Sequence, residues 1–285
     1  MVVKNVQITV LIEDSNSSAK PHLKAKHGIA FLIKAKIDDN EATIMMDTGP
    51  SSDVLLHNVD AMGVNLEDVD VIALSHGHYD HTGGLIEALK RMKKRVPVIG
   101  HPTVFEPKLS IMPHLRLIGA PFRVSDVESV GGVPLLAANP VKIADGIATT
   151  GEVPRITAFE SVRGYWTVHE RSFVDDVMLD DQSLVIDVEN KGLVVVAGCV
   201  HSGIINTIQH AQKITENSRV YAVLGGFHLG NAENKNIQAT VDELKKFDPK
   251  FIGPCHCTGK KATKKIAETF GDRCHPLHTG DIIEF

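Results

Sequence analysis

The sequence predicts an α/β protein, and three observations support this class. Short aliphatic strands alternate with amphipathic helices along the 285 residues. Hydrophobic residues make up 43% of the chain and charged residues 23%, which suits a large packed core and argues against disorder. Histidines repeatedly follow apolar strands, and ligand sites in α/β sheets gather at the carboxyl ends of strands. We therefore expect a single domain over residues 1–285.

In the first half, apolar patterning predicts five strands, at residues 6–12, 29–37, 42–46, 69–75 and 96–100. The second and third strands form a hairpin that turns at residues 38–41. A helix is expected from residue 82 to about residue 94, because a polar residue and two glycines precede its apolar face. This succession follows the βαβ pattern of α/β proteins.

The second half repeats the alternation. Residues 183–201 are predicted to form two strands that turn at Asn190–Gly192, and two further strands are expected within residues 219–228 and 250–259. Helical spacing of apolar residues predicts helices at residues 203–214, 236–247 and 260–270. Residues 105–180 are rich in proline and glycine and are less periodic, which indicates an insertion or cap.

Charge and segment composition exclude several classes of protein. The net charge is −5 with the 15 histidines counted as neutral, which argues against a nucleic-acid partner. The start of the chain lacks the apolar run and cleavage site of a signal peptide. No stretch approaches the roughly 18–20 apolar residues of a membrane span. We expect a cytoplasmic protein without a membrane partner.

Four cysteines are present, and their spacing does not resemble a secreted disulfide framework. A structural zinc site is an alternative, because two of the cysteines are one residue apart and a third is followed by histidine. Its ligands would be Cys255, Cys257 and Cys274 with His275 or His278.

The stretch "HGHYDH" carries four metal-binding side chains, His76, His78, Asp80 and His81. His76 and His78 alternate along the backbone, so both can face one point. Asp80 and His81 follow a turn and can face a second point. Imidazole and carboxylate suit zinc, manganese or iron, and two ions about 3.5–4 Å apart can share a water molecule. The stretch therefore predicts a centre of one or two ions.

Three distant histidines also follow apolar strands, namely His201, His228 and His256. Because strand ends meet at one edge of an α/β sheet, these side chains are expected to join His76 at a single site.

At these residues the chain resembles the metallo-β-lactamase superfamily. "SHGHYDHTGG" is similar to its main signature, "MMDTGPSSD" to its first motif and "GPCHCTG" to its last. The resemblance implies a four-layer αββα sandwich with the site along one edge. It also implies that Asp47 hydrogen-bonds near the ligands and that His256 binds the second metal.

The middle motifs depart from the superfamily pattern. Cys199 stands where an aspartate that bridges two metals is expected, and His201 follows two residues later. We therefore assign His201 as the third ligand beside His76 and His78. Cys199 is placed next to the ligands, either as a buried structural residue or as a soft thiolate ligand. Without the bridging aspartate, one tight and one weak metal position are expected.

Five segments narrow the resemblance to a subgroup: "KAKHGIAFLI", "TTGEVPR", "LDDQSLVI", "GCVHSGIINT" and "GGFHL". They are similar to an archaeal and anaerobe-rich subgroup whose members are described as 7,8-dihydropterin-6-methyl-4-(β-D-ribofuranosyl)-aminobenzene-5′-phosphate synthases of methanopterin biosynthesis. The resemblance implies that an aromatic ring compound attacks the methylene of a pterin-methyl diphosphate, with carbon–carbon or carbon–nitrogen coupling and loss of diphosphate. A small phosphorylated substrate is the expected partner, and the protein itself is expected to form a homo-oligomer.

Several residues in these segments are candidates for substrate contact. His27 and His228 are expected to contact substrate or to stabilise developing charge, with Asp80 and His228 as the catalytic pair. Arg155 can clamp a phosphate through two hydrogen bonds, beside Glu152. Asp181 is a further substrate-binding candidate or a replacement oxygen ligand. Tyr165 and Trp166 can stack on a heterocycle or serve in packing.

Two other functions remain open at the level of sequence. A metal-dependent hydrolase would use a metal-bound hydroxide against a phosphodiester, lactone or thioester, with Asp80 orienting it. A redox or metal-sensing protein would use iron and Cys199. Zinc is the first expectation for the cofactor, with manganese, magnesium or iron as alternatives.

Overall fold

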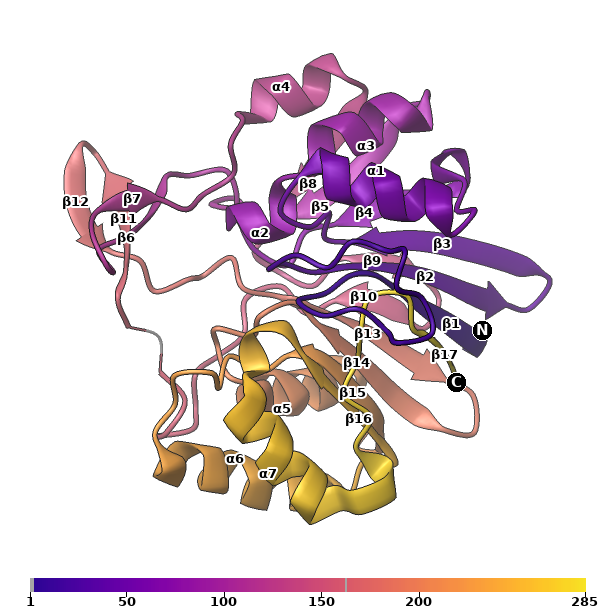
Figure 1. Ribbon diagram of the computed structural model, residues 1–285, viewed down its shortest axis with the longest axis vertical. Coiled ribbons are helices and arrows are strands. Elements are labelled where there is room, and N and C mark those ends of the chain that lie inside the picture. Colours follow the sequence, from indigo (N-terminus) through magenta and orange to yellow (C-terminus); the bar gives the residue numbers. More distant parts are fainter. Residues whose placement is uncertain (1–2, 162) are drawn as a thin grey trace.

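Strands lie between two layers of helices in the computed structural model, which describes residues 3–161 and 163–285 (Figure 1). One layer contains α1 (Ser52–Ala61), α3 (Leu85–Met92) and α4 (Val124–Ser129). The other contains α5 (Ile204–Thr215), α6 (Asn234–Phe247) and α7 (Lys260–Phe270). In the described ranges, no helix has the length and apolarity needed to cross a membrane. The layers form the αββα sandwich that the resemblance implied.

The first half of the chain builds one sheet of the sandwich. Its strands, in spatial order, are β1 (Val3–Ile12), β2 (Ala30–Ile37), β3 (Asn40–Met46), β4 (Val71–Ala73), β5 (Val96–Gly100) and β8 (Gly132–Leu136). The first three are antiparallel, and β3, β4, β5 and β8 are parallel. The hairpin of β2 and β3 has the register expected from the sequence, with Phe31 opposite Met46.

The second half builds the facing sheet. Its strands are β13 (Ser183–Val188), β14 (Gly192–Ala197), β15 (Val220–Gly226) and β16 (Phe251–Cys255), and the last three are parallel. Three short strands extend the sheets, β9 (Lys142–Ala144), β10 (Ile147–Thr149) and β17 (Ile282–Glu284). A single parallel pair, Val3 with Val188, connects β1 to β13. The two sheets are therefore continuous through one seam.

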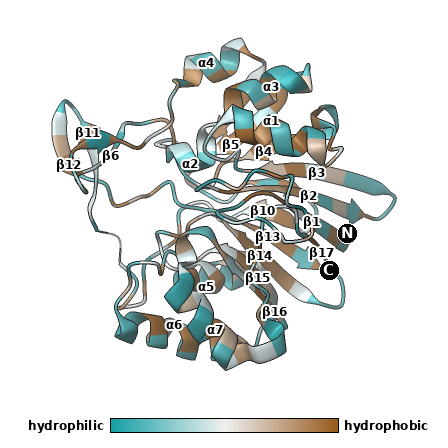
Figure 2. Cartoon of the chain, viewed as in Figure 1, coloured by the Kyte–Doolittle hydropathy of each residue, from teal (hydrophilic) through white to brown (hydrophobic). Residues whose placement is uncertain are grey.

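Three apolar clusters account for the layers. The central cluster lies between the sheets and joins side chains such as Phe31 and Ile33 to Val194 and Leu224. A second cluster packs α1 and α3 on the first sheet, and a third packs α5, α6 and α7 on the other. The outer helices carry hydrophobic and hydrophilic bands (Figure 2), which matches burial of one helical face.

The helix expected from residue 82 to about residue 94 is divided. The short helix α2 (Tyr79–Thr82) ends before α3 begins at Leu85. Two glycines separate the helices because the chain at residues 48–50 passes against them. A Cβ atom on Gly83 would lie 2.2 Å from the oxygen of Pro50, and one on Gly84 would lie 2.4 Å from the oxygen of Thr48. Close backbone contact, which sequence periodicity does not report, fixes the boundary.

Residues 105–180 divide between the sandwich and a second, small sheet. The middle part supplies α4 and the strands β8, β9 and β10 to the sandwich. The two ends supply the small sheet, which consists of β6 (Lys108–Ser110), β7 (Arg116–Leu117), β11 (Tyr165–His169) and β12 (Ser172–Asp175). This sheet projects from the sandwich (Figure 1) and leaves Leu117 and Phe173 exposed. Its role as a cap over substrate stays a prediction.

Candidate metal centre

Four chain segments that are distant in sequence end at one place. The loop after β4 and the short helix α2 form the first segment, and the loops after β14, β15 and β16 form the others. The side chains at these ends are His76, His78, Asp80, His81, Cys199, His201, His228, His256 and Cys257. Because β14, β15 and β16 are parallel, their carboxyl ends lie at the same edge of the sheet.

The first group of ligands consists of His76, His78 and His201. One ring nitrogen of each lies within 4.8 Å of the others. His76 Nε2 and His78 Nδ1 are 2.9 Å apart. The ring centroid of His201 lies 4.8 Å from that of His76 and 5.0 Å from that of His78. Three buried imidazoles therefore face a common point.

Several buried nitrogen atoms at these strand ends have no hydrogen-bond partner. They are Nε2 of His78, both ring nitrogens of His201 and Nε2 of His256. Leaving a buried polar atom without a partner costs about 1–3 kcal/mol, so such atoms are rare. Neutral imidazole nitrogen is the commonest metal ligand in proteins, and a divalent ion would satisfy these atoms. The donor set therefore fits a metal ion.

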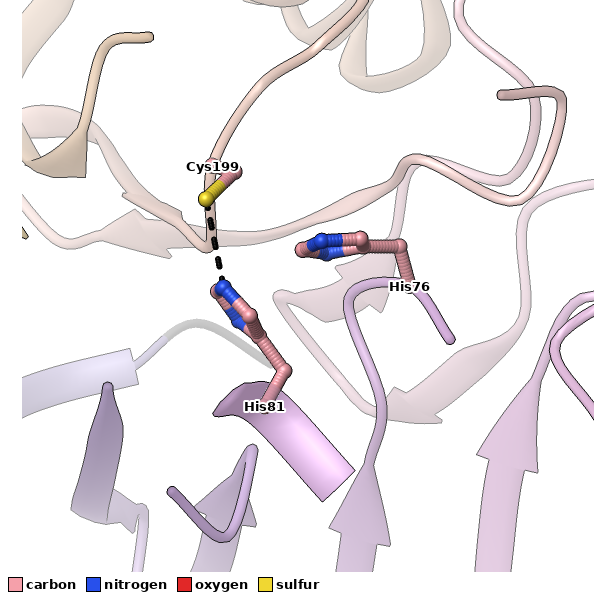
Figure 3. A group of neighbouring side chains, drawn as sticks. All are labelled: His76, His81 and Cys199. Atoms are coloured by element: carbon pink, nitrogen blue, oxygen red, sulfur yellow. Dashed lines mark hydrogen bonds between the residues drawn. The ribbon is translucent and has the colours of Figure 1, made fainter. Parts of the chain in front are cut away.

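The second group surrounds Asp80. One carboxylate oxygen, Oδ2, lies 3.5 Å from His256 Nε2 and 3.8 Å from His81 Nε2. His81 Nε2 also lies 3.2 Å from Cys199 Sγ, as the dashed line in Figure 3 marks. Figure 3 shows the His81 ring pointing at the Cys199 sulfur and the His76 ring beside it. The cysteine thus lies between the two groups of ligands.

Asp47 orients the signature loop. Its Oδ2 accepts hydrogen bonds from Ser75 Oγ at 2.6 Å and from His81 Nδ1 at 2.7 Å, and its Oδ1 accepts one from the Ser75 amide at 2.7 Å. A carboxylate on Nδ1 leaves Nε2 of His81 free for a metal. The structure thus places Asp47 behind the ligands, where the resemblance puts it.

Two acidic residues after β1 orient His256 in the same way. Asp14 Oδ1 lies 2.8 Å from His256 Nδ1, and Glu13 Oε1 accepts the His256 amide at 2.7 Å. The sequence prediction missed both residues. Neither lies in a motif, and their contact with residue 256 exists only because β1 and β16 converge in the fold.

Two further aspartates hold the loops in position. Asp181 accepts the amides of His201 and Ser202 at 2.9 and 2.8 Å, and burial raises its pKa to about 6. Asp180 accepts the amide of Gly77 at 2.8 Å and also receives Lys108. Asp181, a candidate substrate or metal ligand, therefore has both oxygens in contact with backbone amides, and its role toward substrate stays a prediction.

Backbone strain gathers in the three loops after the parallel strands. Val200, His228 and His256 have φ angles of 46°, 49° and 50°, in the left-handed region. Non-glycine residues in this region cost about 1–3 kcal/mol and cluster at functional sites. Each loop thus turns sharply where it presents a side chain to the centre.

Burial and charge separate the pKa values of the ligands. Burial lowers the pKa of His76 and His201 well below the ordinary value and that of His78 to about 3. Burial works against protonation of His256, but the hydrogen bond with Asp14 and the nearby carboxylate of Asp80 raise its pKa. Burial also opposes ionisation of Asp80, yet the charges of His81 and His256 lower its pKa. The first group therefore offers neutral imidazoles, and the second group pairs charges.

We expect the metal-free protein to lose stability as the pH falls below 6.5. The unfolded His78 binds its proton near 6.5, whereas the folded form resists it down to about 3. Proton uptake by the unfolded chain therefore lowers the free energy of unfolding by about 1.4 kcal/mol per pH unit for such a histidine. Urea unfolding of chelator-treated protein between about pH 8 and pH 5 measures the slope. A free energy of unfolding that stays level or rises over this range would contradict the expectation, and His78→Phe should remove one histidine's share.

The small sheet brings an aromatic side chain to the histidines. Tyr165, the first residue of β11, has its ring 5.1 Å from that of His78 and 5.0 Å from that of His201. Its hydroxyl oxygen lies 3.3 Å from Nε2 of His228, and the ring of His228 lies 4.1 Å from that of His201. The sequence singled out Tyr165 only as a stacking candidate, because no motif connects β11 to the strand ends.

The other substrate candidates lie at different distances from the centre. His27 is at its rim, with a 60% exposed side chain, Nδ1 2.9 Å from Asp14 and Nε2 3.5 Å from Asp80. Glu152 pairs with His101 at 2.8 Å, and Arg155 donates to the carbonyls of Val177 and Met178. The structure thus brings His27 to the site but does not bring Glu152 or Arg155 against the ligands. Their contact with substrate stays a prediction.

The alternative structural zinc site at the C-terminal cysteines has a different geometry. Cys255 is buried in the central core cluster, and Cys257 lies beside Cys199. Cys274 pairs with Ile252, at the opposite end of β16 from Cys257. The structure therefore does not gather these three thiols.

Comparison with known proteins gives one family and two relatives from a methanogen. The description "Metallo-beta-lactamase superfamily" matches residues 29–196. A protein of Methanocaldococcus jannaschii named 7,8-dihydropterin-6-methyl-4-(beta-D-ribofuranosyl)-aminobenzene-5′-phosphate synthase is 35% identical over 99% of this chain and 98% of its own. An uncharacterized protein of the same organism is 32% identical over 86% of this chain and 88% of its own.

Solved structures share the fold. Tm1679, described as a metal-dependent hydrolase of the beta-lactamase superfamily, has a TM-score of 0.82 and 24% identity and covers 98% of this chain and 99% of its own. Zn²⁺-bound PqqB from Methylobacterium extorquens has a TM-score of 0.54 and 11% identity, and the match covers 97% of this chain and 99% of PqqB. At these identities the comparison concerns the architecture alone.

Proposed function

This chain belongs to the metallo-β-lactamase superfamily, and from this premise we propose that it is a metal-dependent synthase that joins a dihydropterin-methyl diphosphate to a ribofuranosylaminobenzene phosphate. The observation that carries the proposal is its similarity to the archaeal synthase, which extends over 99% of this chain and 98% of the relative. The shared length includes every residue of the candidate centre. The proposed partner is a small phosphorylated molecule in the cytoplasm, and no nucleic acid or membrane is proposed.

The proposed metal positions follow the two groups of donors. His76, His78 and His201 would hold one ion, and Asp80, His81 and His256 a second. Zinc is the first proposal, with manganese, magnesium or iron as alternatives. When bound, the ions would supply Lewis-acid neutralisation of the departing diphosphate.

In the proposed reaction, the amine nitrogen of the aminobenzene attacks the methylene carbon of the pterin. A carbon–nitrogen bond forms, and the carbon–oxygen bond to diphosphate breaks with its electron pair leaving on oxygen. The amine then loses one proton. Asp80 is proposed to accept a hydrogen bond from the amine and so orient it, because its lowered pKa keeps the carboxylate ionised, and the proton passes to solvent.

His228 is proposed to face the diphosphate. Burial opposes protonation of its ring, but the neighbouring Cys257 raises its pKa. The protonated ring can donate hydrogen bonds to an anionic leaving group. Its Nδ1 is buried without a partner and is available for this contact.

An assay for the coupled product tests the proposed function. Purified protein is incubated with both phosphorylated substrates and each candidate metal, and the product is detected by mass spectrometry. Product formation that needs metal is the expected result. Failure to couple with any of the four metals would contradict the synthase. Metal-dependent cleavage of bis-p-nitrophenyl phosphate by the same protein, lost in His78→Ala, would instead favour the hydrolase.

We expect Tyr165→Phe to lower kcat about tenfold while KM changes little. Burial raises the pKa of the Tyr165 phenol, so it serves as a hydrogen-bonding group that fixes the His228 ring rather than as a base. Steady-state kinetics of the coupling reaction measure both constants. Tyr221→Phe is the matched control, since Tyr221 lies near the start of β15 and packs on Phe285. Equal kcat values for the Tyr165 and Tyr221 variants would contradict this role.

A further inference from the structure

Cys199 occupies a prepared position at the end of β14. It is only 4% exposed. Two glycines, Gly198 and Gly226, allow the backbone to pass close to it. A Cβ atom on Gly198 would lie 2.2 Å from Ser75 Oγ, and one on Gly226 would lie 2.6 Å from Cys257 Sγ and 3.4 Å from the Cα atom of Cys199. Larger residues at either glycine would displace the cysteine or the signature loop. The backbone thus brings this sulfur close to the ligands.

The sulfur of Cys199 lies near donor atoms of several residues. It forms a set within 4.8 Å with His76 and His81, a second with His201 and His228, and a third with His256 and Cys257. Ligand atoms around one tetrahedral zinc ion lie roughly 3.3–3.8 Å apart, given bond lengths of about 2.0 Å to nitrogen and 2.3 Å to sulfur. The 3.2 Å separation from His81 Nε2 is close to this range.

An independent observation points to a ligand at the same place. His256, which is 8% exposed, has its Nε2 buried without a hydrogen-bond partner. His256 and Cys199 belong to the same set of residues whose donor atoms lie within 4.8 Å of one another. A metal ion would satisfy that nitrogen, and the donor set that His256 shares with Cys199 puts the sulfur within reach of such an ion.

We propose that Cys199 is a direct thiolate ligand of the ion held by Asp80, His81 and His256, and that this sulfur makes the position selective for thiophilic ions. On binding, the thiol gives up its proton and its sulfur forms the metal bond. Zinc and ferrous iron accept such a ligand, whereas magnesium and manganese prefer oxygen. The inference rests on the metal dependence proposed above and adds the identity of the ligand and the class of ion.

Cobalt(II) substitution tests this ligand without substrate. Cobalt is titrated into chelator-treated, full-length protein, and a sulfur-to-cobalt charge-transfer band is sought in the near ultraviolet. The band should appear in the unmodified protein and in Cys274→Ser and Cys257→Ser, and it should be absent from Cys199→Ser and Cys199→Asp. Zinc should bind Cys199→Ser about 100-fold or more weakly at one position. Loss of a residue that only hydrogen-bonds to a metal ligand already lowers metal affinity about 10–100-fold.

Two outcomes overturn the proposal. One is a band that survives in Cys199→Ser, and the other is a band lost only in Cys257→Ser, which would assign the sulfur to the neighbour. X-ray absorption of the zinc-loaded, unmodified protein covers the case in which a variant misfolds. A sulfur shell at about 2.3 Å is expected, and its absence would refute the proposal.

These measurements are independent of the synthase reaction. If metal binds through sulfur but no product forms, the ligand assignment stands and the proposed function fails. If metal binds without sulfur, only the ligand assignment falls.

Discussion

Replacing His201 with alanine should lower the rate of coupling by about 10³-fold or more. Its two ring nitrogens are buried without hydrogen-bond partners and face His76 and His78. Removal of His201 would leave two imidazoles at the first metal position. Loss of Lewis-acid stabilisation of the transition state, worth several kcal/mol, corresponds to a rate decrease of about 10³-fold. The bound metal should fall by one ion per chain where two bind. Elemental analysis and steady-state kinetics on the same preparation measure both quantities.

His169→Ala is the matched control for this substitution. His169 ends β11 and is exposed, so the same change should leave the rate and metal content unaltered. A His201→Ala protein that binds and turns over like the control would contradict the assignment of the first metal position. Unchanged metal content with a lower rate would instead limit His201 to substrate contact.

Replacing Lys108 with methionine should lower the free energy of unfolding by about 3–5 kcal/mol. Lys108 is 2% exposed, and its Nζ lies 3.0 Å from Asp176 and 2.9 Å from Asp180. Burial opposes its charge, but the two aspartates raise its pKa. Methionine would leave Asp180 as a buried, unpaired carboxylate. Because Asp180 also accepts the Gly77 amide, the loop that carries His76 and His78 should loosen too.

Urea unfolding of the variant measures this effect, and two further variants interpret it. Lys142→Met breaks a surface pair with Asp145 and should change the free energy of unfolding far less. Adding Asp180→Asn to Lys108→Met should recover part of the loss, since the unpaired charge is removed. A loss below about 1 kcal/mol in Lys108→Met would show that this buried group of charges adds little to stability.

The elements that sequence patterns predicted best are those whose signal is local. The strands of the sandwich are apolar runs bounded by turn residues, and β2 and β3 pair in the expected hairpin. The histidines of the centre were found because each directly follows such a run. Their convergence could be anticipated, since parallel strands end at one edge.

What sequence reasoning missed depends on contacts between distant segments. Asp14 follows β1 without any motif, and only the fold brings it to His256. Tyr165 reaches His201 from a sheet of two- to five-residue strands, which leave little periodic signal. The division of residues 105–180 has the same origin, because β8 and β10 are short and are defined by their partners β5 and β13. The break between α2 and α3 likewise follows from the passage of residues 48–50.

Among the described strands, none pairs with the outer side of β7 or of β12, the two edges of the small sheet that carries Tyr165. An unpaired edge strand is a template for association with another chain, and proteins limit this hazard by keeping such strands short. Here β7 has two residues and β12 has four. So little length gives a neighbouring molecule few backbone groups to pair with. The sheet can therefore carry the exposed apolar side chains of Leu117 and Phe173 with limited risk of polymerisation.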